Sequence, residues 1–307
     1  MSVCLTCVWE QSEGRVVDLS VQPSKTIWAS EVGVNEASIR RHLNHPQIAA
    51  QGRAEAFAIK SGVRILALDI ETAPNLAYVW GLWDQNVGLN QLVNSTEMLC
   101  FGTRWLGEKE VTFRSTFHDG KEAMLEELHE QLNEADAMMG WNSKGFDSKH
   151  IKREFLEAGM LPTSPYKELD LMQVVKSNFR FPSNKLDYVS QRLGVGAKVK
   201  HSGFDLWIRC MAGDAEAWEE MKKYQIQDVD LLIDLYDKLL PWMGTSHPNV
   251  AVLSERPDAC IRCGGEDLSA NGFEHTSTGT YRKFQCDDCG TWQRDSKRLG
   301  TASLRRI

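Results

Sequence analysis

The sequence lacks a membrane-spanning segment, a secretory leader and an excess of basic residues. No stretch of the 307 residues approaches the roughly 18 consecutive apolar residues of a membrane-spanning helix. The N-terminus has no basic segment followed by an apolar one, so a secretory leader is not expected. The formal net charge is −7, which argues against binding of nucleic acid by bulk charge. We therefore expect a cytoplasmic protein that has no membrane partner.

Acidic residues outnumber basic residues in the middle of the chain. Residues 63–242 contain 20 lysines and arginines against 28 aspartates and glutamates, a net charge of −8. A polyanionic partner would need local binding sites there, because the field of the whole segment repels it. The segments on either side are closer to neutral, and we expect them to contribute more to the binding of nucleic acid.

Cysteine is used sparingly and in pairs. Six of the eight cysteines form C-x-x-C pairs, which are Cys4/Cys7, Cys260/Cys263 and Cys286/Cys289. In a reducing cytoplasm such pairs are more often metal ligands than disulfides. The other two cysteines, Cys100 and Cys210, are expected to be ordinary buried residues.

An acidic pair lies at the end of an apolar segment. Residues 63–70 are rich in branched apolar side chains and predict a buried strand. Side chains two positions apart on a strand point to the same face, so Asp69 and Glu71 project together. Two adjacent carboxylates repel each other unless a cation lies between them, and hard oxygen ligands favour Mg²⁺ or Mn²⁺. A solvated strand end is the alternative interpretation.

A second acidic group lies on a late helix. The apolar spacing of residues 216–240 predicts a helix, on which Tyr224 and Asp228 share one face. Gln225 and Gln227 are expected to point elsewhere. The phenol can hold a water molecule beside the carboxylate, although a simple surface pair is the alternative.

A third group follows a short apolar strand at residues 137–141. The turn Asn142 to Asp147 leads into a helix predicted for residues 148–157. Asp147 stands at the helix start, where an aspartate commonly caps the helix. A capping role and a metal-facing role are compatible.

The order of these groups carries a family resemblance. D-x-E, then N-x₄-D after a strand, then Y-x₃-D on a late helix resembles the DEDD superfamily of 3′→5′ exonucleases, in its tyrosine-containing branch. The proofreading domains of family-B DNA polymerases belong to that branch. The resemblance covers residues 63–242 and includes residues 184–194, which look like the family's helix before the last motif. It implies an α/β, RNase H-like fold with a mixed, mostly parallel five-stranded sheet flanked by helices.

The resemblance also implies a chemistry. Two Mg²⁺ or Mn²⁺ ions would activate the attacking water and face the leaving 3′ oxygen. Tyr224 would orient the water, and Asn142 would contact the nucleic acid. The ligands of the two ions would be Asp69, Glu71, Asp147 and Asp228.

The C-terminal cysteines predict a small zinc domain. Two C-x₂-C-G segments, with 22 residues between Cys263 and Cys286, resemble a zinc ribbon that binds one Zn²⁺ through Cys260, Cys263, Cys286 and Cys289. We expect a linker at residues 243–257, the ribbon at 258–295 and a basic tail at 296–307. Arg282 and Lys283 are candidate nucleic-acid contacts, although a structural or protein-binding ribbon is nearly as well supported.

Residues 26–42 resemble a helix-turn-helix, in which Ala29 would permit close helix packing and Gly33 would take the turn, and we expect the whole module at residues 1–46. Arg40 and Arg41 would face phosphate groups, and residues 47–62 would form a linker or helix. Two interpretations of the flanking residues stay open. Either they form a Cys₂His₂ site for a second Zn²⁺, or they are an unpaired C-x-x-C and two surface histidines. The residues concerned are Cys4, Cys7, His42 and His45.

Taken together, the sequence predicts a metal-dependent 3′→5′ exodeoxyribonuclease from a bacterium or phage. DNA is the expected partner, through single-stranded 3′ ends and through duplex at the helix-turn-helix. A proofreading role would require a polymerase, replication or repair protein as a separate chain. An RNA exonuclease, a structure-specific endonuclease and a non-catalytic DNA-binding regulator stay open as alternatives.

Overall fold

The computed structural model describes residues 62–199 and 201–301. The predicted helix-turn-helix, with Arg40, Arg41 and the four N-terminal candidate zinc ligands, lies outside the described residues. Within them, no helix combines the length and the apolar character that crossing a membrane requires.

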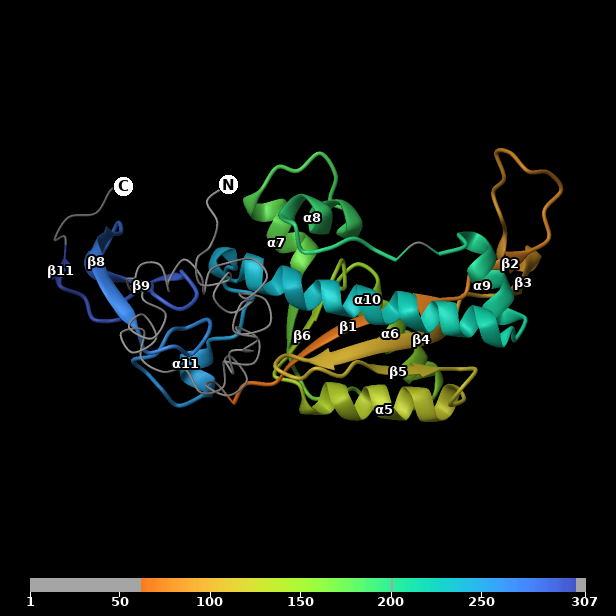
Figure 1. The fold of residues 1–307 in the computed structure, drawn as a ribbon, viewed down its shortest axis with the longest axis horizontal. Helices are drawn as coiled ribbons and strands as arrows, with labels where there is room; N and C mark the ends of the chain where they lie inside the picture. Colours follow the sequence, from red (N-terminus) through yellow and green to blue (C-terminus); the bar gives the residue numbers. More distant parts are fainter. Residues whose placement is uncertain (1–61, 200, 302–307) are drawn as a thin grey trace, which may run out of the picture.

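A five-stranded sheet forms the centre of the molecule, with the strand order β5-β4-β1-β6-β7 (Figure 1). The central strand β1 pairs antiparallel with β4 and parallel with β6, and β6 continues parallel to β7. The expected mixed five-stranded sheet is therefore confirmed, but it is not mostly parallel, because β4 also pairs antiparallel with β5 and two of the four pairings are antiparallel. The strands are β1 (Ile65–Thr72), β4 (Met98–Trp105), β5 (Thr112–Ser115), β6 (Ala137–Gly140) and β7 (Lys167–Asp170).

Side chains of β1 alternate between two hydrophobic cores. Leu66, Leu68 and Ile70 pack on one face, against α5 (Lys121–Glu134) and α6 (Asp147–Glu157). Ile65 and Ala67 pack on the other face, against the long helix α10 (Ala215–Leu239). Asp69 and Glu71 continue this second set, because every other residue of a strand faces the same way. The alternation therefore directs both carboxylates toward α10.

Three helices cover the α10 face of the sheet, and α10 runs along most of its length (Figure 1). Its N-cap Asp214 accepts hydrogen bonds from the backbone N–H groups of Glu216 and Ala217, which fixes the helix start. The helices are α7 (Leu171–Asn178), α8 (Leu186–Leu193) and α10 (Ala215–Leu239).

A glycine permits the close approach of α10 to the sheet. Gly102 of β4 lies directly opposite Asp69 in the β1–β4 pair. A Cβ atom at Gly102 would meet Gln225 Cγ at 2.8 Å and Val229 Cγ2 at 3.0 Å. Both contacts are shorter than side chains tolerate without moving, so a larger residue would push away the helix that carries Tyr224 and Asp228.

A third cluster lies where α10 begins. Helix α9 (Phe204–Met211) packs Leu206 and Cys210 against Trp218 and Met221 of α10. A small hairpin consists of β2 (Leu76–Ala77) and β3 (Leu92–Asn94), with the short helix η1 (Leu89–Gln91) before β3. Trp80 in its loop is fully exposed.

The C-terminal sheet lies beyond the other end of α10 (Figure 1). Its strands all pair with β9, and β11 extends the sheet past the predicted end of the ribbon at residue 295. The elements are β8 (Leu268–His275), β9 (Gly279–Cys286), β10 (Trp292–Arg294) and β11 (Gly300–Thr301).

The predicted linker at residues 243–257 differs from the structure. It contains a helix, α11 (Val250–Leu253), and follows the short helix η2 (Leu240–Trp242) that extends α10. The buried guanidinium of Arg262 donates hydrogen bonds to the carbonyl oxygens of Met243, at 3.0 Å, and Gly244, at 2.8 Å. Apolar residues inside the segment pack onto the main core, which its prolines and polar residues did not indicate.

Candidate active site

Three carboxylates converge where the C-terminal half of β1 meets α10. Candidate ligand atoms of Asp69, Glu71 and Asp228 all lie within 4.8 Å of one another. Asp69 and Glu71 come from the strand, and Asp228 comes from the middle of the helix that packs on it. The structure therefore brings together two motifs that are separated by more than 150 residues in the sequence.

Asp147 approaches the same cluster from the other side of β1. It is the first residue of α6, and its Oδ1 accepts a hydrogen bond from the backbone N–H of Ile70 at 3.2 Å. The residue before the helix is Phe146, and no side chain caps the helix end, so the alternative role of Asp147 as an N-cap is not observed. Instead its carboxylate binds to the strand segment between Asp69 and Glu71.

Tyr224 and Asp228 share a lysine that the sequence did not single out. Lys198 Nζ donates to the Tyr224 hydroxyl oxygen at 2.8 Å and to Asp228 Oδ2 at 2.5 Å. The ammonium group also lies 4.9 Å from the centre of the Tyr224 ring. Tyr224 and Asp228 therefore occupy one helix face as predicted, and a cation connects their polar ends.

Burial raises the pKa values of the clustered carboxylates. Burial raises the pKa of Asp69 well above its usual range, and the neighbouring Asp147 and Glu71 raise it further. Burial likewise raises the pKa of Glu71 to about 7, against the lowering effect of Lys198. Burial is also the main cause that raises the pKa of Asp147 to about 7. Such shifts are typical of carboxylates arranged to receive positive charge.

The donor set fits divalent metal ions. Asp228 Oδ1 is buried and has no hydrogen-bond partner among the residues that the structure describes. A buried carboxylate oxygen without a partner is costly, and coordination of a cation removes that cost. Oxygen ligands alone favour Mg²⁺ or Mn²⁺ over softer metals.

The raised pKa values predict how stability depends on pH. Glu71 and Asp147 titrate at about 7 in the folded protein and near their ordinary values, about 4, when unfolded. Between these values the folded state holds more protons, so the free energy of unfolding falls as the pH rises through this window. Protein dialysed free of Mg²⁺ should therefore melt at a lower temperature at about pH 8 than at about pH 5.5.

Thermal melts with and without Mg²⁺ measure this effect. Mg²⁺ should raise the melting temperature most at the higher pH, where the carboxylates are ionised. Glu71→Gln removes one of the titrating groups and should flatten the pH dependence. An equally steep profile in wild type and Glu71→Gln would show that the cluster is not its source.

Gln225 contradicts the expectation that it points away from the site. It is fully buried, and its Nε2 donates to the Asp69 carbonyl oxygen at 2.6 Å and to Asp69 Oδ2 at 2.9 Å. The signal was present in the sequence, because residue 225 falls on the apolar stripe of α10 between Met221 and Val229. Lys198 lies in a loop without a motif, and nothing in its neighbourhood marked it.

The other predicted contacts with nucleic acid are dispersed. Asn142 lies in the turn between β6 and α6 with φ 64°, and its backbone N–H donates to Asp170 Oδ1 at 3.0 Å. Arg282 and Lys283 lie on β9, far along the chain from the carboxylates. None of these three side chains contacts the carboxylate cluster through a hydrogen bond that the described residues show.

The four C-terminal cysteines form a second candidate metal site. Their sulfur atoms lie within 4.8 Å of one another, with Cys260 and Cys289 3.6 Å apart and Cys263 and Cys286 also 3.6 Å apart. Zn–S bonds of about 2.3 Å in a tetrahedron bring sulfur atoms to about this separation. Backbone N–H groups of Arg262 and Gly265 point at two of the sulfurs, each at 3.4 Å. The predicted ligand set is therefore assembled and fits Zn²⁺.

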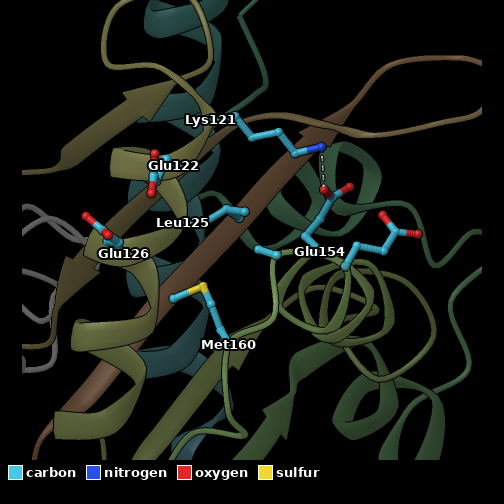
Figure 2. Close-up of a pocket in the computed structure, with 8 residues that line it drawn as sticks. Lys121, Glu122, Leu125, Glu126, Glu154 and Met160 are labelled. Carbon is cyan, nitrogen blue, oxygen red and sulfur yellow. Dashed lines mark ion pairs between the residues drawn. The ribbon is translucent and has the colours of Figure 1, made fainter.

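A pocket of about 420 Å³ lies on the opposite side of the sheet, between α5 and α6. Figure 2 shows Glu154 at its wall, paired with Lys121 at 3.0 Å. Arg153 also pairs with Glu154, and the backbone N–H of Met98 donates to it at 2.9 Å. This carboxylate thus has a structural role in holding α6 to β4 and α5, and the pocket is not part of the carboxylate cluster.

The chain is similar to proteins of known structure. The chain is similar to the family B DNA polymerase from the hyperthermophilic archaeon Pyrobaculum calidifontis, with 16% sequence identity and a TM-score of 0.47 over 70% of this chain. This chain covers 31% of the length of the polymerase. No curated protein sequence matches.

Comparison with protein families gives a direct assignment. Residues 87–240, half of the chain, match the family RNase_H_2, which is described as RNase_H superfamily. The match includes Asp147, Tyr224 and Asp228 and begins after β1, which carries Asp69 and Glu71. Together with the strand order, this match shows that the chain belongs to the RNase_H superfamily.

Proposed function

We propose that the protein is a metal-dependent 3′→5′ exonuclease that hydrolyses phosphodiester bonds of DNA. The observation that carries this proposal is the convergence of Asp69, Glu71 and Asp228 on the helix face that bears Tyr224, with Asp147 hydrogen-bonded to the backbone of Ile70 between the first two. Membership of the RNase_H superfamily supports a nuclease, and the tyrosine one helical turn before Asp228 favours the exonuclease branch that the motifs resemble.

In this proposal each residue of the cluster has a distinct role. Asp69, Glu71, Asp147 and Asp228 hold two Mg²⁺ or Mn²⁺ ions, which activate water and stabilise the charge on the leaving oxygen. Tyr224 orients the water through its hydroxyl group. Its pKa is raised by burial and by Asp228, so the phenol stays protonated and acts as a hydrogen-bonding group rather than as a base.

Gln225 and Lys198, which the sequence motifs did not indicate, support this arrangement. Gln225 binds both the backbone and the side chain of Asp69, which fixes the rotation of α10 relative to β1. Lys198 donates hydrogen bonds to both the Tyr224 hydroxyl oxygen and Asp228, which holds these two groups together. Both residues therefore position ligands before binding, which reduces the ordering that binding would otherwise require.

The flanking segments complete the proposal. Residues 63–242 form the nuclease unit, and the cysteine cluster binds one Zn²⁺ in a ribbon that extends the molecule beyond α10. The segment before residue 62 supplies duplex contact through the predicted helix-turn-helix. A polymerase or repair protein could then recruit the chain as a separate subunit.

The polarity of digestion tests this function. A single DNA strand labelled at its 5′ end should shorten progressively when Mg²⁺ or Mn²⁺ is present, because cleavage proceeds from the 3′ end. The same strand with a blocked 3′ terminus should resist. Products of both reactions are separated by denaturing electrophoresis.

Three substrates separate the alternatives in the same assay. Immediate cutting of circular single-stranded DNA would indicate an endonuclease. Faster digestion of an RNA strand of the same sequence would assign the activity to RNA. Absence of digestion of every strand, with both metals present, would favour a non-catalytic DNA-binding protein.

A further inference from the structure

The two faces of strand β9 differ in composition. Successive residues of a strand point to opposite faces, so Lys283 and Arg282 lie on different sides of the C-terminal sheet. Residues directly opposite in an antiparallel pair share a face. Lys283 lies opposite Arg294 of β10, whereas Arg282 lies opposite Phe273 of β8. The structure therefore separates two basic residues that the sequence places side by side.

The face that carries Lys283 alternates aromatic and cationic groups. Lys283 Nζ lies 5.3 Å from the centre of the Trp292 ring, and the Arg294 guanidinium lies 4.3 Å from the centre of the Tyr281 ring. Arg298 Nε donates to the Tyr281 hydroxyl oxygen at 3.3 Å. We call this set of five residues, Tyr281, Lys283, Trp292, Arg294 and Arg298, the ribbon face.

The ribbon face is accessible and carries positive charge. Trp292 is 48% exposed, and Arg294 and Arg298 are exposed as well. Glu274 pairs with Arg294 at 3.0 Å and offsets part of the charge. Three cations against this one carboxylate contrast with the acidic segment 63–242 described above. The positive charge of the ribbon face therefore attracts a polyanion locally.

We propose that the ribbon face binds single-stranded DNA, namely the part of the strand that lies 5′ to the end held at the carboxylate cluster. The cations match backbone phosphates, and the exposed Trp292 ring offers a stacking surface for a base. This combination of basic groups and aromatic rings is what proteins use to bind single strands without sequence preference. The identity of the strand rests on the proposed nuclease function, whereas the binding surface does not.

The position of the ribbon suits this role. Asp228 lies 11 residues before the end of α10, which at 1.5 Å per residue places the ribbon beyond about 17 Å along the helix axis. Arg262 and the shared core hold the ribbon rigidly to that helix end. A strand of a few nucleotides cannot reach both places, whereas a longer strand can.

Binding of a labelled strand to the full-length protein tests the proposal. The parent protein carries Asp69→Asn, so that the strand stays intact, and chelators are omitted because they would remove zinc. The probe is an oligo(dT) strand of about 30 nucleotides, followed by fluorescence anisotropy. Trp292→Ala should weaken binding about tenfold. Lys283→Ala should weaken it severalfold and reduce the slope of log K against log salt by about 0.7.

Arg282 is a candidate contact from the sequence, but it lies on the face opposite to Lys283, so Arg282→Ala is the matched control that removes the same charge outside the ribbon face. It should bind the strand as the parent does, and Lys283→Arg should restore the parent affinity. Zinc content and melting temperature confirm that each variant is folded. Equal weakening by Arg282→Ala and Lys283→Ala, or parent-like binding of Trp292→Ala, would overturn the proposal, as would tighter binding of a duplex through the same residues.

Cleavage assays with wild-type Asp69 distinguish this inference from the proposed function. On long strands the ribbon-face variants should raise KM and leave kcat unchanged, and on strands of a few nucleotides they should match the wild type. If the wild-type protein digests DNA and all ribbon-face variants bind the strand normally, only the proposal of strand binding at the ribbon face is refuted. A protein that digests nothing, yet loses strand binding on Trp292→Ala, would refute only the nuclease.

Discussion

Asp69→Asn is expected to abolish nuclease activity while leaving the fold intact. The substitution keeps the shape of the side chain and an oxygen that can accept the Gln225 hydrogen bond, but it removes a negative charge from the carboxylate cluster. Loss of several kcal/mol of stabilisation by the metal ions corresponds to a decrease in rate of about 10³-fold or more. Initial rates on a 5′-labelled strand with saturating Mg²⁺ measure the effect.

The melting temperature of the same variant should not fall with its activity. Burial and neighbouring carboxylates raise the pKa of Asp69, so its ionised form is repelled in the metal-free protein. Removal of that charge should leave the melting temperature unchanged or higher when Mg²⁺ is absent. Loss of activity with a lower melting temperature would instead indicate misfolding.

Two further variants place this result in context. Glu219→Gln removes an exposed carboxylate from α10 and should leave the rate unchanged. Tyr224→Phe keeps all four carboxylates and should reduce the rate less than Asp69→Asn does. Wild-type activity of purified Asp69→Asn would exclude the carboxylate cluster as the active site.

Loss of the cysteine site is expected to have the largest effect on stability. Cys289→Ser removes one of four thiolates that lie within 4.8 Å of one another, and about one Zn²⁺ per chain should be lost with it. Zinc binding supplies about 10–16 kcal/mol in small zinc domains, which generally do not fold without it. The C-terminal sheet should therefore unfold and become sensitive to proteolysis.

The loss should stay local to one end of the molecule. Cys260, Cys286 and Cys289 belong to the same buried cluster as Tyr236 and Leu239, so the end of α10 should loosen as well. Tyr224 and Asp228 lie two or more turns away along the helix, and digestion of short strands should persist.

Metal analysis and limited proteolysis measure both outcomes. Cys210→Ser is the matched control, since Cys210 is buried but lies outside the cysteine cluster. It should keep its zinc. A wild-type content of two Zn²⁺ per chain would support the N-terminal site of Cys4, Cys7, His42 and His45. Unchanged zinc content in Cys289→Ser would contradict the assignment of the C-terminal ligands.

The parts of the site that the sequence predicted are those with local periodic signals. The two-residue period of a strand placed Asp69 and Glu71 on one face, and the helical spacing of Tyr224 and Asp228 placed them on another. The order of the three motifs then indicated which fold would bring these faces together. All three steps depend on residue types at fixed separations, which a single sequence displays.

The parts that the sequence did not predict depend on contacts between distant segments. Lys198 reaches Asp228 from a loop with no periodicity, so only the folded chain shows the pairing. Gln225 is expected to point away from the face shared by Tyr224 and Asp228, yet the packing of α10 on β1 brings its side chain onto Asp69. The segment around α11 was predicted as a linker because its prolines and polar residues do not show the packing of Val250 and Met243 against the core.

The most direct test of the metal-dependent active site is the position of bound Mn²⁺. Crystals of the wild-type protein grown with Mn²⁺ and a mononucleotide should show anomalous scattering peaks for two ions bounded by Asp69, Glu71, Asp147 and Asp228. The same experiment on Asp69→Asn should lose at least one of them. A wild-type structure with Mn²⁺ elsewhere and none between these carboxylates would contradict the proposed active site.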